Sequence, residues 1–163
     1  TIKLTPKDGS DTELAQFTMT LTGFKPLSDL NEEWAIAGKT EVNQFFGKKF
    51  RGKPDGDKTA EVKAIPTKSW INLVQMSVKR GGNHVDLFAE KVKSENGNYN
   101  VTAWTPSSDK TEYRDIYLEE PQIAVVSAKK EGNFLYIKYR LTQVNETAVD
   151  GKEKEVQIHL ILP

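Results

Sequence analysis

The second half of the chain alternates apolar and polar residues and interrupts the alternation with Gly and Asn at short intervals. The run over residues 70–79 stops at Gly81-Gly82-Asn83, and the run over residues 84–93 stops at Asn96-Gly97-Asn98. A period of two places successive side chains on opposite faces of a strand, and Gly and Asn supply the turns between strands. This pattern predicts an antiparallel sheet and restricts the chain to a mainly β fold.

We expect one β domain over residues 1–163, built as an antiparallel β-sandwich of an immunoglobulin-like or jelly-roll-like kind. Turn signals of this spacing predict about 8 to 10 strands. A closed β-barrel is the alternative, since both arrangements hide strand edges. The expected strands are residues 1–5, 14–22, 59–65, 70–79, 84–93, 99–104, 113–118, 122–128, 134–141 and 156–162.

One segment, at about residues 26–50, has a different pattern and predicts a helical insertion. Polar caps and a first turn of glutamates favour a helix over residues 28–37 that Gly38 ends. Residues 40–46 fit either a second helix or a strand. We therefore expect one or two short helices near residues 28–47, placed either as a crossover or as a cap over one open end of the sandwich or barrel.

The composition excludes several classes of function. Lys plus Arg and Asp plus Glu both number 23, so the net charge is zero and no global field attracts nucleic acid or an anionic membrane. The chain has no cysteine, which removes thiolate chemistry and Cys-based zinc sites. Its two histidines, His84 and His159, have no partner at a metal or triad spacing. We expect no enzyme activity, no metal and no cofactor, although carboxylates from distant strands can meet without leaving a local motif.

Two groups of residues are candidate binding sites. Trp104, Tyr113 and Tyr117 lie near a predicted loop and could stack on a sugar ring. Core packing is the commoner role of a tryptophan in a strand. Lys49 and Arg51 lie in a basic patch with Phe46 and Phe50, as a site for phosphates and stacked bases would require. The alternative for this patch is a solvated loop beside a helix C-terminus.

Paired carboxylates form a third group. Asp55 and Asp57 flank a glycine and could offer oxygens to calcium, but they do not complete the twelve-residue calcium loop. Turn formation is the favoured interpretation.

These observations predict a non-catalytic exported or cell-surface domain that binds a glycan or a protein through loop ends and edge strands. A secreted protein or a lipoprotein is consistent with a chain that starts at Thr1 rather than Met. A structural subunit that pairs through an edge strand, for example of a phage, virion or surface appendage, is the alternative. A barrel that binds single-stranded nucleic acid through residues 48–53 is a third hypothesis.

A hairpin pattern near the end of the chain resembles a known family. Residues 131–139 read EGNFLYIKY and residues 156–162 read VQIHLIL. Together they resemble the C-terminal hairpin of small exported lipoproteins of the NigD-like kind. The resemblance covers about thirty residues of the 163 and carries no functional residue.

Overall fold

The structure is a computed structural model that describes residues 2–4, 15–17, 32–143 and 149–163. Two short strands near the N-terminus, β1 (Ile2–Leu4) and β2 (Ala15–Phe17), pair with each other in antiparallel fashion. They confirm a strand within residues 1–5 and part of the strand expected at 14–22. The remainder of that second strand lies outside the described residues.

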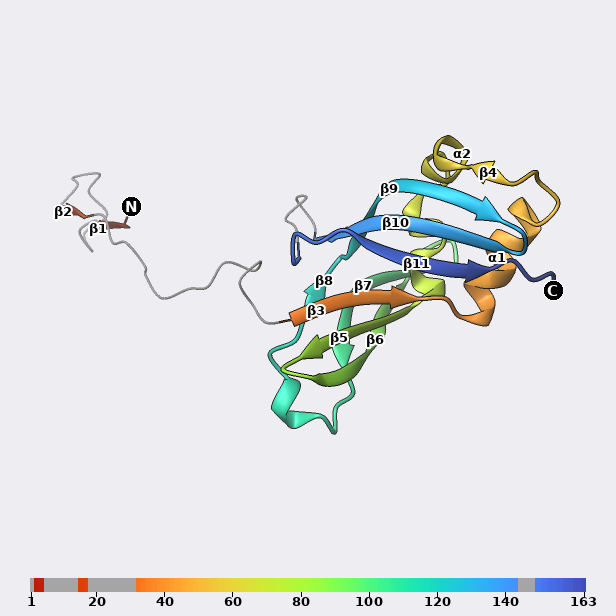
Figure 1. Cartoon of the computed structure of the whole chain (residues 1–163). Coiled ribbons are helices and arrows are strands. Elements are labelled where there is room, and N and C mark those ends of the chain that lie inside the picture. The colour runs from red at the N-terminus through yellow and green to blue at the C-terminus, as the bar shows by residue number, and fades with distance from the viewer. Residues whose placement is uncertain (1, 5–14, 18–31, 144–148) are drawn as a thin grey trace.

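The other strands form two antiparallel sheets (Figure 1). The five-stranded sheet has the order β3-β5-β6-β7-β8, and the four-stranded sheet has the order β11-β10-β9-β4. The strands of the first are β3 (Glu32–Ala37), β5 (Gln75–Arg80), β6 (Asn83–Lys93), β7 (Tyr99–Pro106) and β8 (Leu118–Glu119). The strands of the second are β4 (Gly56–Asp57), β9 (Gln122–Glu131), β10 (Phe134–Thr142) and β11 (Lys154–His159).

The expected β-sandwich is confirmed, and the sheets do not close into a barrel. At one edge β3 lies against β11, yet the two strands belong to different sheets. Most consecutive strands are sheet neighbours, so the connections are those of a meander. Immunoglobulin-like and jelly-roll folds connect their strands through Greek keys instead.

The core lies between the sheets and follows the predicted alternation. Buried side chains recur at every second position of the long strands, with polar residues between them on the outer faces. The buried residues of this kind include Val85, Leu87, Leu135, Ile137, Tyr139, Leu141, Val156 and Ile158. At the hairpin between β5 and β6 the chain reverses through Gly81 and Gly82, whose φ angles of 54° and 90° suit glycine.

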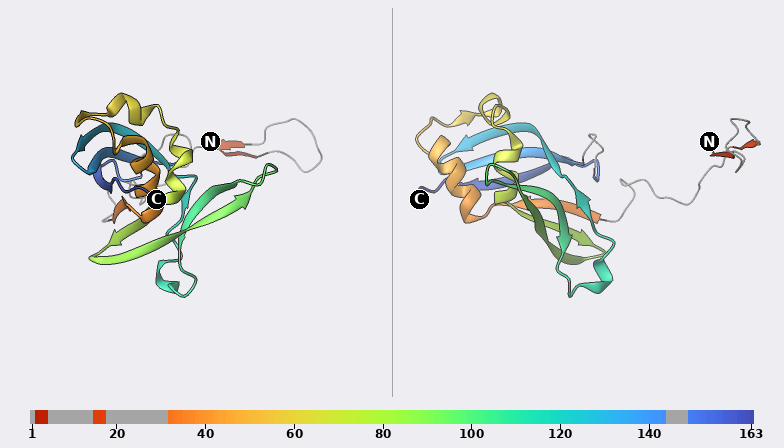
Figure 2. Two further views of the ribbon diagram at one scale, coloured as in Figure 1. Left: turned by 90° about the vertical axis from the view of Figure 1, so that its right-hand side faces the viewer. Right: turned by 180° about the vertical axis from the view of Figure 1, so that it is seen from behind.

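One end of the sandwich is covered by the helix α1 (Thr40–Phe50), seen beside the ends of β10 and β11 in Figures 1 and 2. Phe46 and Phe50 point from α1 into the core, where Phe46 packs edge-on against Trp70. Gly47 lies so close to the chain after β11 that an added Cβ would stand 1.8 Å from the carbonyl oxygen of Ile161. The cap over an open end is therefore confirmed, and it is one helix at residues 40–50.

Three predicted elements are wrong in type. Residues 32–37 of the expected helix form the strand β3, because Glu32, Trp34 and Ile36 are buried along one face and the strand pairs with β5. The expected strand at 59–65 is the helix α2 (Thr59–Lys63). The expected edge strand at 113–118 begins at the last residue of the 3-10 helix η4 (Thr111–Tyr113) and continues as a turn and irregular chain. It is strand only at Leu118, where the edge strand β8 starts. The expected strand at 70–79 begins only at Gln75, after the 3-10 helices η2 (Thr67–Ser69) and η3 (Ile71–Leu73).

Candidate functional site

The basic patch lies at the C-terminal end of α1, and its aromatic rings are not available for stacking. Lys49 and Arg51 are exposed, but Phe46 and Phe50 are buried at 0% and 2% exposure. The ammonium group of Lys49 lies 5.1 Å from the ring centre of Phe45 on the same helix. The patch therefore lacks the exposed rings that a single-stranded nucleic-acid site uses, and its cations lie where a helix dipole favours them.

The carboxylates on either side of Gly56 have structural partners. Asp55 accepts hydrogen bonds from the buried Lys130 side chain at 2.6 Å and from the Gly132 N–H at 3.0 Å. Asp57 accepts from the Thr59 hydroxyl and N–H at the start of α2. These donors lower the pKa of both carboxyl groups. Turn formation therefore fits Asp57, whereas Asp55 joins its loop to β9 and to the turn that follows β9.

Trp104 and the two tyrosines, expected together, have different environments. Trp104 is 3% exposed and packs in the core, so its ring cannot reach a ligand. Tyr113 is half-buried against the same core, and Tyr117 is 52% exposed. Of the three aromatic residues, only the tyrosines reach a surface hollow.

Tyr117 lines a hollow of about 530 Å³ between β6 and the segment that follows β7, which we call the aromatic groove. Phe88, on the outer face of β6, is 57% exposed in the same groove. Sequence reasoning missed Phe88, although it alternates with the buried Val85 and Leu87 and so had to face outward. The other side chains on its wall include Glu90, Pro106, Lys110 and Arg114.

A second hollow of about 410 Å³ adjoins the aromatic groove and shares Phe88, Ser107 and Lys110 with it. Tyr113 lines this hollow together with three acidic residues, Asp86, Asp109 and Glu112. His84 is also present, with its Nε2 at 3.0 Å from an oxygen of Asp86. The described residues contain no group of three or more His, Cys, Asp or Glu side chains placed to hold a metal ion.

The segment that carries the tyrosines is held in place from both ends. Ile116 is buried at 2% exposure, and backbone hydrogen bonds join Lys110 to Ser107, Tyr113 to Lys110 and Ile116 to Tyr113. Arg80 reaches this segment from β5 with a 2.9 Å ion pair to Asp115, and its guanidinium also contacts Glu32. The same ion pair lowers the pKa of Asp115 and raises that of Arg80. The walls of the groove are therefore formed before a ligand binds.

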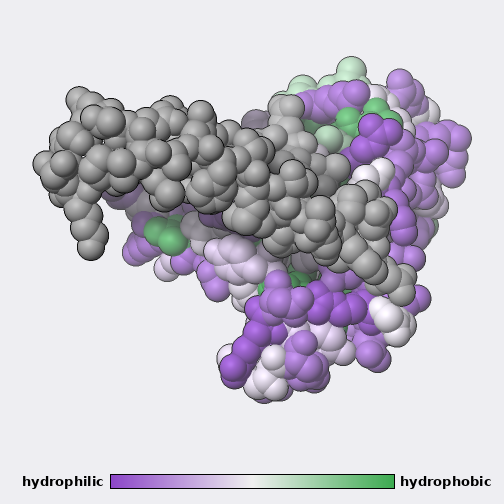
Figure 3. Space-filling view, turned by 90° about the vertical axis from the view of Figure 1, so that its left-hand side faces the viewer, coloured by the Kyte–Doolittle hydropathy of each residue, from purple (hydrophilic) through white to green (hydrophobic). Residues whose placement is uncertain are grey.

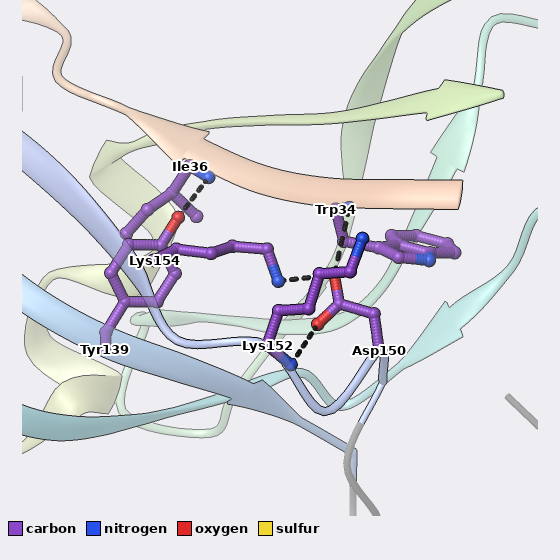
Figure 4. Close-up of polar contacts among 6 residues, drawn as sticks. All are labelled: Trp34, Ile36, Tyr139, Asp150, Lys152 and Lys154. Atoms are coloured by element: carbon purple, nitrogen blue, oxygen red, sulfur yellow. Dashed lines mark hydrogen bonds and ion pairs between the residues drawn. The ribbon is translucent and has the colours of Figure 1, made fainter. Parts of the chain in front are cut away.

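A third cluster of polar residues, which we call the seam, joins the two sheets where β3 meets β10 and β11 (Figure 4). The Ile36 N–H donates to the Tyr139 hydroxyl oxygen at 2.9 Å, and the Trp34 N–H donates to an Asp150 carboxylate oxygen at 3.3 Å. Asp150 also accepts from the Lys152 N–H at 3.1 Å and from the Lys154 ammonium group. Asp150 and Tyr139 are buried. This cluster is structural, because its acceptors are used by backbone groups of β3 and by their own loop.

The seam bears on pairing through edge strands. The N–H groups of Trp34 and Ile36 lie on the side of β3 that faces away from β5, which is the side where a further strand would pair. Both N–H groups already have acceptors. At the other ends of the sheets, β4 and β8 have two residues each. Bonded or very short edges resist addition of a strand from another chain.

The surface seen in Figure 3, apart from its grey atoms, is mostly hydrophilic, with hydrophobic side chains only in small separate patches. No helix among the described residues has the length and apolar character of a membrane span.

No family model, curated protein or solved structure matches the chain.

Proposed function

We propose that the protein is a non-catalytic binding domain, exported or at the cell surface, that captures a segment of a partner protein in the aromatic groove. The observation that carries this proposal is that two large exposed rings, those of Phe88 and Tyr117, line the same preformed hollow. Exposed aromatic rings next to an arginine are typical of the residues that dominate protein interfaces.

The charges around the groove indicate which charged residues the partner segment should carry. Lys110 and Arg114 have no ion-pair partner among the described residues, and Glu90 is the one acidic side chain on the groove wall. An apolar residue of the partner would lie between the rings with a carboxylate close to Arg114. A basic residue would follow, facing Asp86, Asp109 and Glu112 in the adjoining hollow.

A peptide segment fits this groove better than a sugar. Lys110 and Arg114 in the groove and the acidic residues of the adjoining hollow offer ion pairs to charged side chains, which a neutral sugar lacks. The seam and the short outer strands count against the alternative of a structural subunit that pairs through a sheet edge.

A peptide library selected on the full chain tests the proposal. Enriched peptides should combine an aromatic or aliphatic residue with an acidic neighbour. Calorimetry should show at least about tenfold weaker binding to Phe88→Ala and to Arg114→Ala, the loss of roughly 1.4 kcal/mol. Tyr99→Ala is the control, because Tyr99 is as exposed as Phe88, at 57%, but does not line this groove.

Two results would contradict the proposal: selection that yields no binding peptide, or peptides that bind Phe88→Ala and the control equally well. Binding of an oligosaccharide that depends on Phe88 would replace the protein partner with a glycan.

Fractionation of the producing cells checks the compartment, and recovery only in the cytoplasm would contradict export.

A further inference from the structure

A smaller hollow, which we call the polar groove, lies where the chain crosses from one sheet to the other between β8 and β9. It encloses about 240 Å³ and is lined mainly by polar side chains, among them Asn72, Tyr99, Asn100, Thr102, Glu120 and Gln122. Asn72, Tyr99 and Asn100 also line a more open hollow of about 630 Å³. A narrow pocket therefore continues into a longer furrow.

Three departures from regular backbone meet at this groove. Asn72 lies in the 3-10 helix η3. Thr102 is an extra residue in β7, where the register with β6 shifts between Glu90 and Lys91. Glu120, with φ of 39°, is the one non-glycine residue of positive φ in the described chain, and its N–H donates to the Thr102 carbonyl at 2.8 Å. Bulges and left-handed residues recur at binding sites because they redirect side chains.

The groove wall has unused hydrogen-bonding groups. The Oδ1 atom of Asn72 is buried and has no hydrogen-bond partner among the described residues. Asn100 and Gln122 are exposed, and their amides make no side-chain hydrogen bond to another described residue. A buried carbonyl oxygen without a hydrogen-bond donor is unfavourable, so a ligand that supplies a donor to Asn72 gains binding free energy there.

A flat aromatic surface stands at the rim. Tyr99 is 57% exposed and lies near the end of the β6–β7 hairpin, which projects from the rest of the sheet in the left-hand view of Figure 2. Amide side chains beside an exposed ring provide both contacts that a sugar requires, hydrogen bonds to its hydroxyl groups and a face for its C–H bonds.

We propose that the polar groove is a second binding site and that it takes an oligosaccharide. One sugar ring occupies the 240 Å³ pocket, with its face on Tyr99 and its hydroxyl groups on Asn72 and Asn100, and the following sugars lie along the furrow. The charged side chains nearby are Lys68, Lys91 and Glu120, which leave an excess of one positive charge. This balance suits a neutral or weakly acidic glycan and does not provide the charge that a nucleic acid needs.

An array of neutral and acidic oligosaccharides, probed with the full chain, tests this inference. We expect at least one oligosaccharide to bind, with affinity reduced at least about tenfold in Tyr99→Ala and in Asn100→Ala, each an exposed residue whose loss leaves the core intact. The matched control is Val92→Ala, because Val92 has the same 57% exposure on the same hairpin but lines neither hollow.

Loss of binding in both groove variants, with the control unchanged and all melting temperatures equal, supports the site. The inference is overturned if no oligosaccharide binds, or if binding survives both Tyr99→Ala and Asn100→Ala. Binding that is lost in Phe88→Ala but not in Tyr99→Ala overturns it as well, because the glycan would then occupy the aromatic groove. The peptide experiment on the aromatic groove is independent of all these results.

Discussion

The seam and the aromatic groove use the same kinds of side chain for opposite purposes. Tyr139 and Asp150 are buried in the seam, and each accepts a hydrogen bond from the backbone of β3. Tyr117, Lys110 and Arg114 are exposed in the groove and have no ion pair or side-chain hydrogen bond to another described residue. Polar groups with internal partners stabilise the fold, whereas those without partners are available to a ligand. Variants should therefore lose stability at the seam and lose binding at the groove.

The largest loss of stability is expected for Asp150→Ala. Removing this carboxylate leaves the Lys154 ammonium group, 13% exposed, and the Trp34 N–H without their acceptor. Breaking a buried ion pair in this way should lower the free energy of unfolding by about 3–5 kcal/mol, measured by urea denaturation. Glu153→Ala is the control, because its 3.6 Å pair with Arg140 is at the surface and is worth about 1 kcal/mol at most. Equal losses in the two variants would refute the structural role of the seam.

Tyr139→Phe tests a single oxygen atom of the seam. The ring stays in the core, but the Ile36 N–H loses its acceptor, and we expect a loss of about 1–3 kcal/mol. Tyr117→Phe makes the same chemical change on a residue that is 52% exposed and should change stability by about 0.5 kcal/mol or less. Similar denaturation midpoints for the two variants would remove the contrast between seam and groove.

The pH dependence of stability separates the same two tyrosines. Burial raises the pKa of Tyr139 above its usual value of 10.0, so its contribution is complete below pH 10 and is lost as the pH rises through the folded-state value. From pH 9 upward the wild type should therefore lose more stability than Tyr139→Phe. The two proteins share all their other titratable groups, so the effect of those groups cancels in the comparison. Parallel stability curves would show that the phenol does not titrate with the unfolding of the seam.

The smallest effect is expected where the groove itself has an internal ion pair. Arg80 lowers the pKa of Asp115, so this contact is present above pH 3.8 and is lost as the pH falls through the lower folded-state value. Because Asp115 is 67% exposed, Asp115→Asn should change global stability by about 1 kcal/mol or less. Hydrogen exchange of residues 111–117 should nevertheless become faster. Unchanged exchange would mean that Ile116 alone holds this segment.

The sequence was sufficient to predict the strands of the long hairpins. It was not sufficient for segments whose hydrophobic pattern fits both a helix and a strand. In β10 the apolar residues recur at every second position, a pattern that fits only a strand, and this segment is a strand in the structure. Residues 32–37 fit both periods, since Trp34 and Ile36 alternate while Trp34 and Ala37 also have helical spacing. Pairing with β5 decides for the strand, and that partner lies some forty residues away. At α2, Asp57 precedes the N-cap and accepts a hydrogen bond from the Thr59 N–H, a local contact that an aspartate before a helix can supply.

The candidate sites show the same limit. Tyr113 and Tyr117 were identified because they lie near a loop, and Phe88 follows from the alternation of β6. The polar groove could not be predicted from the sequence, because Asn72, Tyr99 and Glu120 come from three separate segments that meet only in the folded chain. The sequence also could not decide whether Trp104 is exposed or buried, because its burial depends on the residues that pack against it in the core.

The contact at Gly47 offers a way to find relatives of this chain. A methyl group there would overlap the backbone at Ile161, and a backbone cannot move aside as a flexible side chain can. We expect a distant protein that keeps this helix packed against the segment after β11 to keep a glycine at that point, even where the rest of the sequence has changed. A glycine in the interior of a helix, with an apolar segment like residues 160–162 packed on it directly after a strand, is thus a signature that can be sought when overall similarity has disappeared.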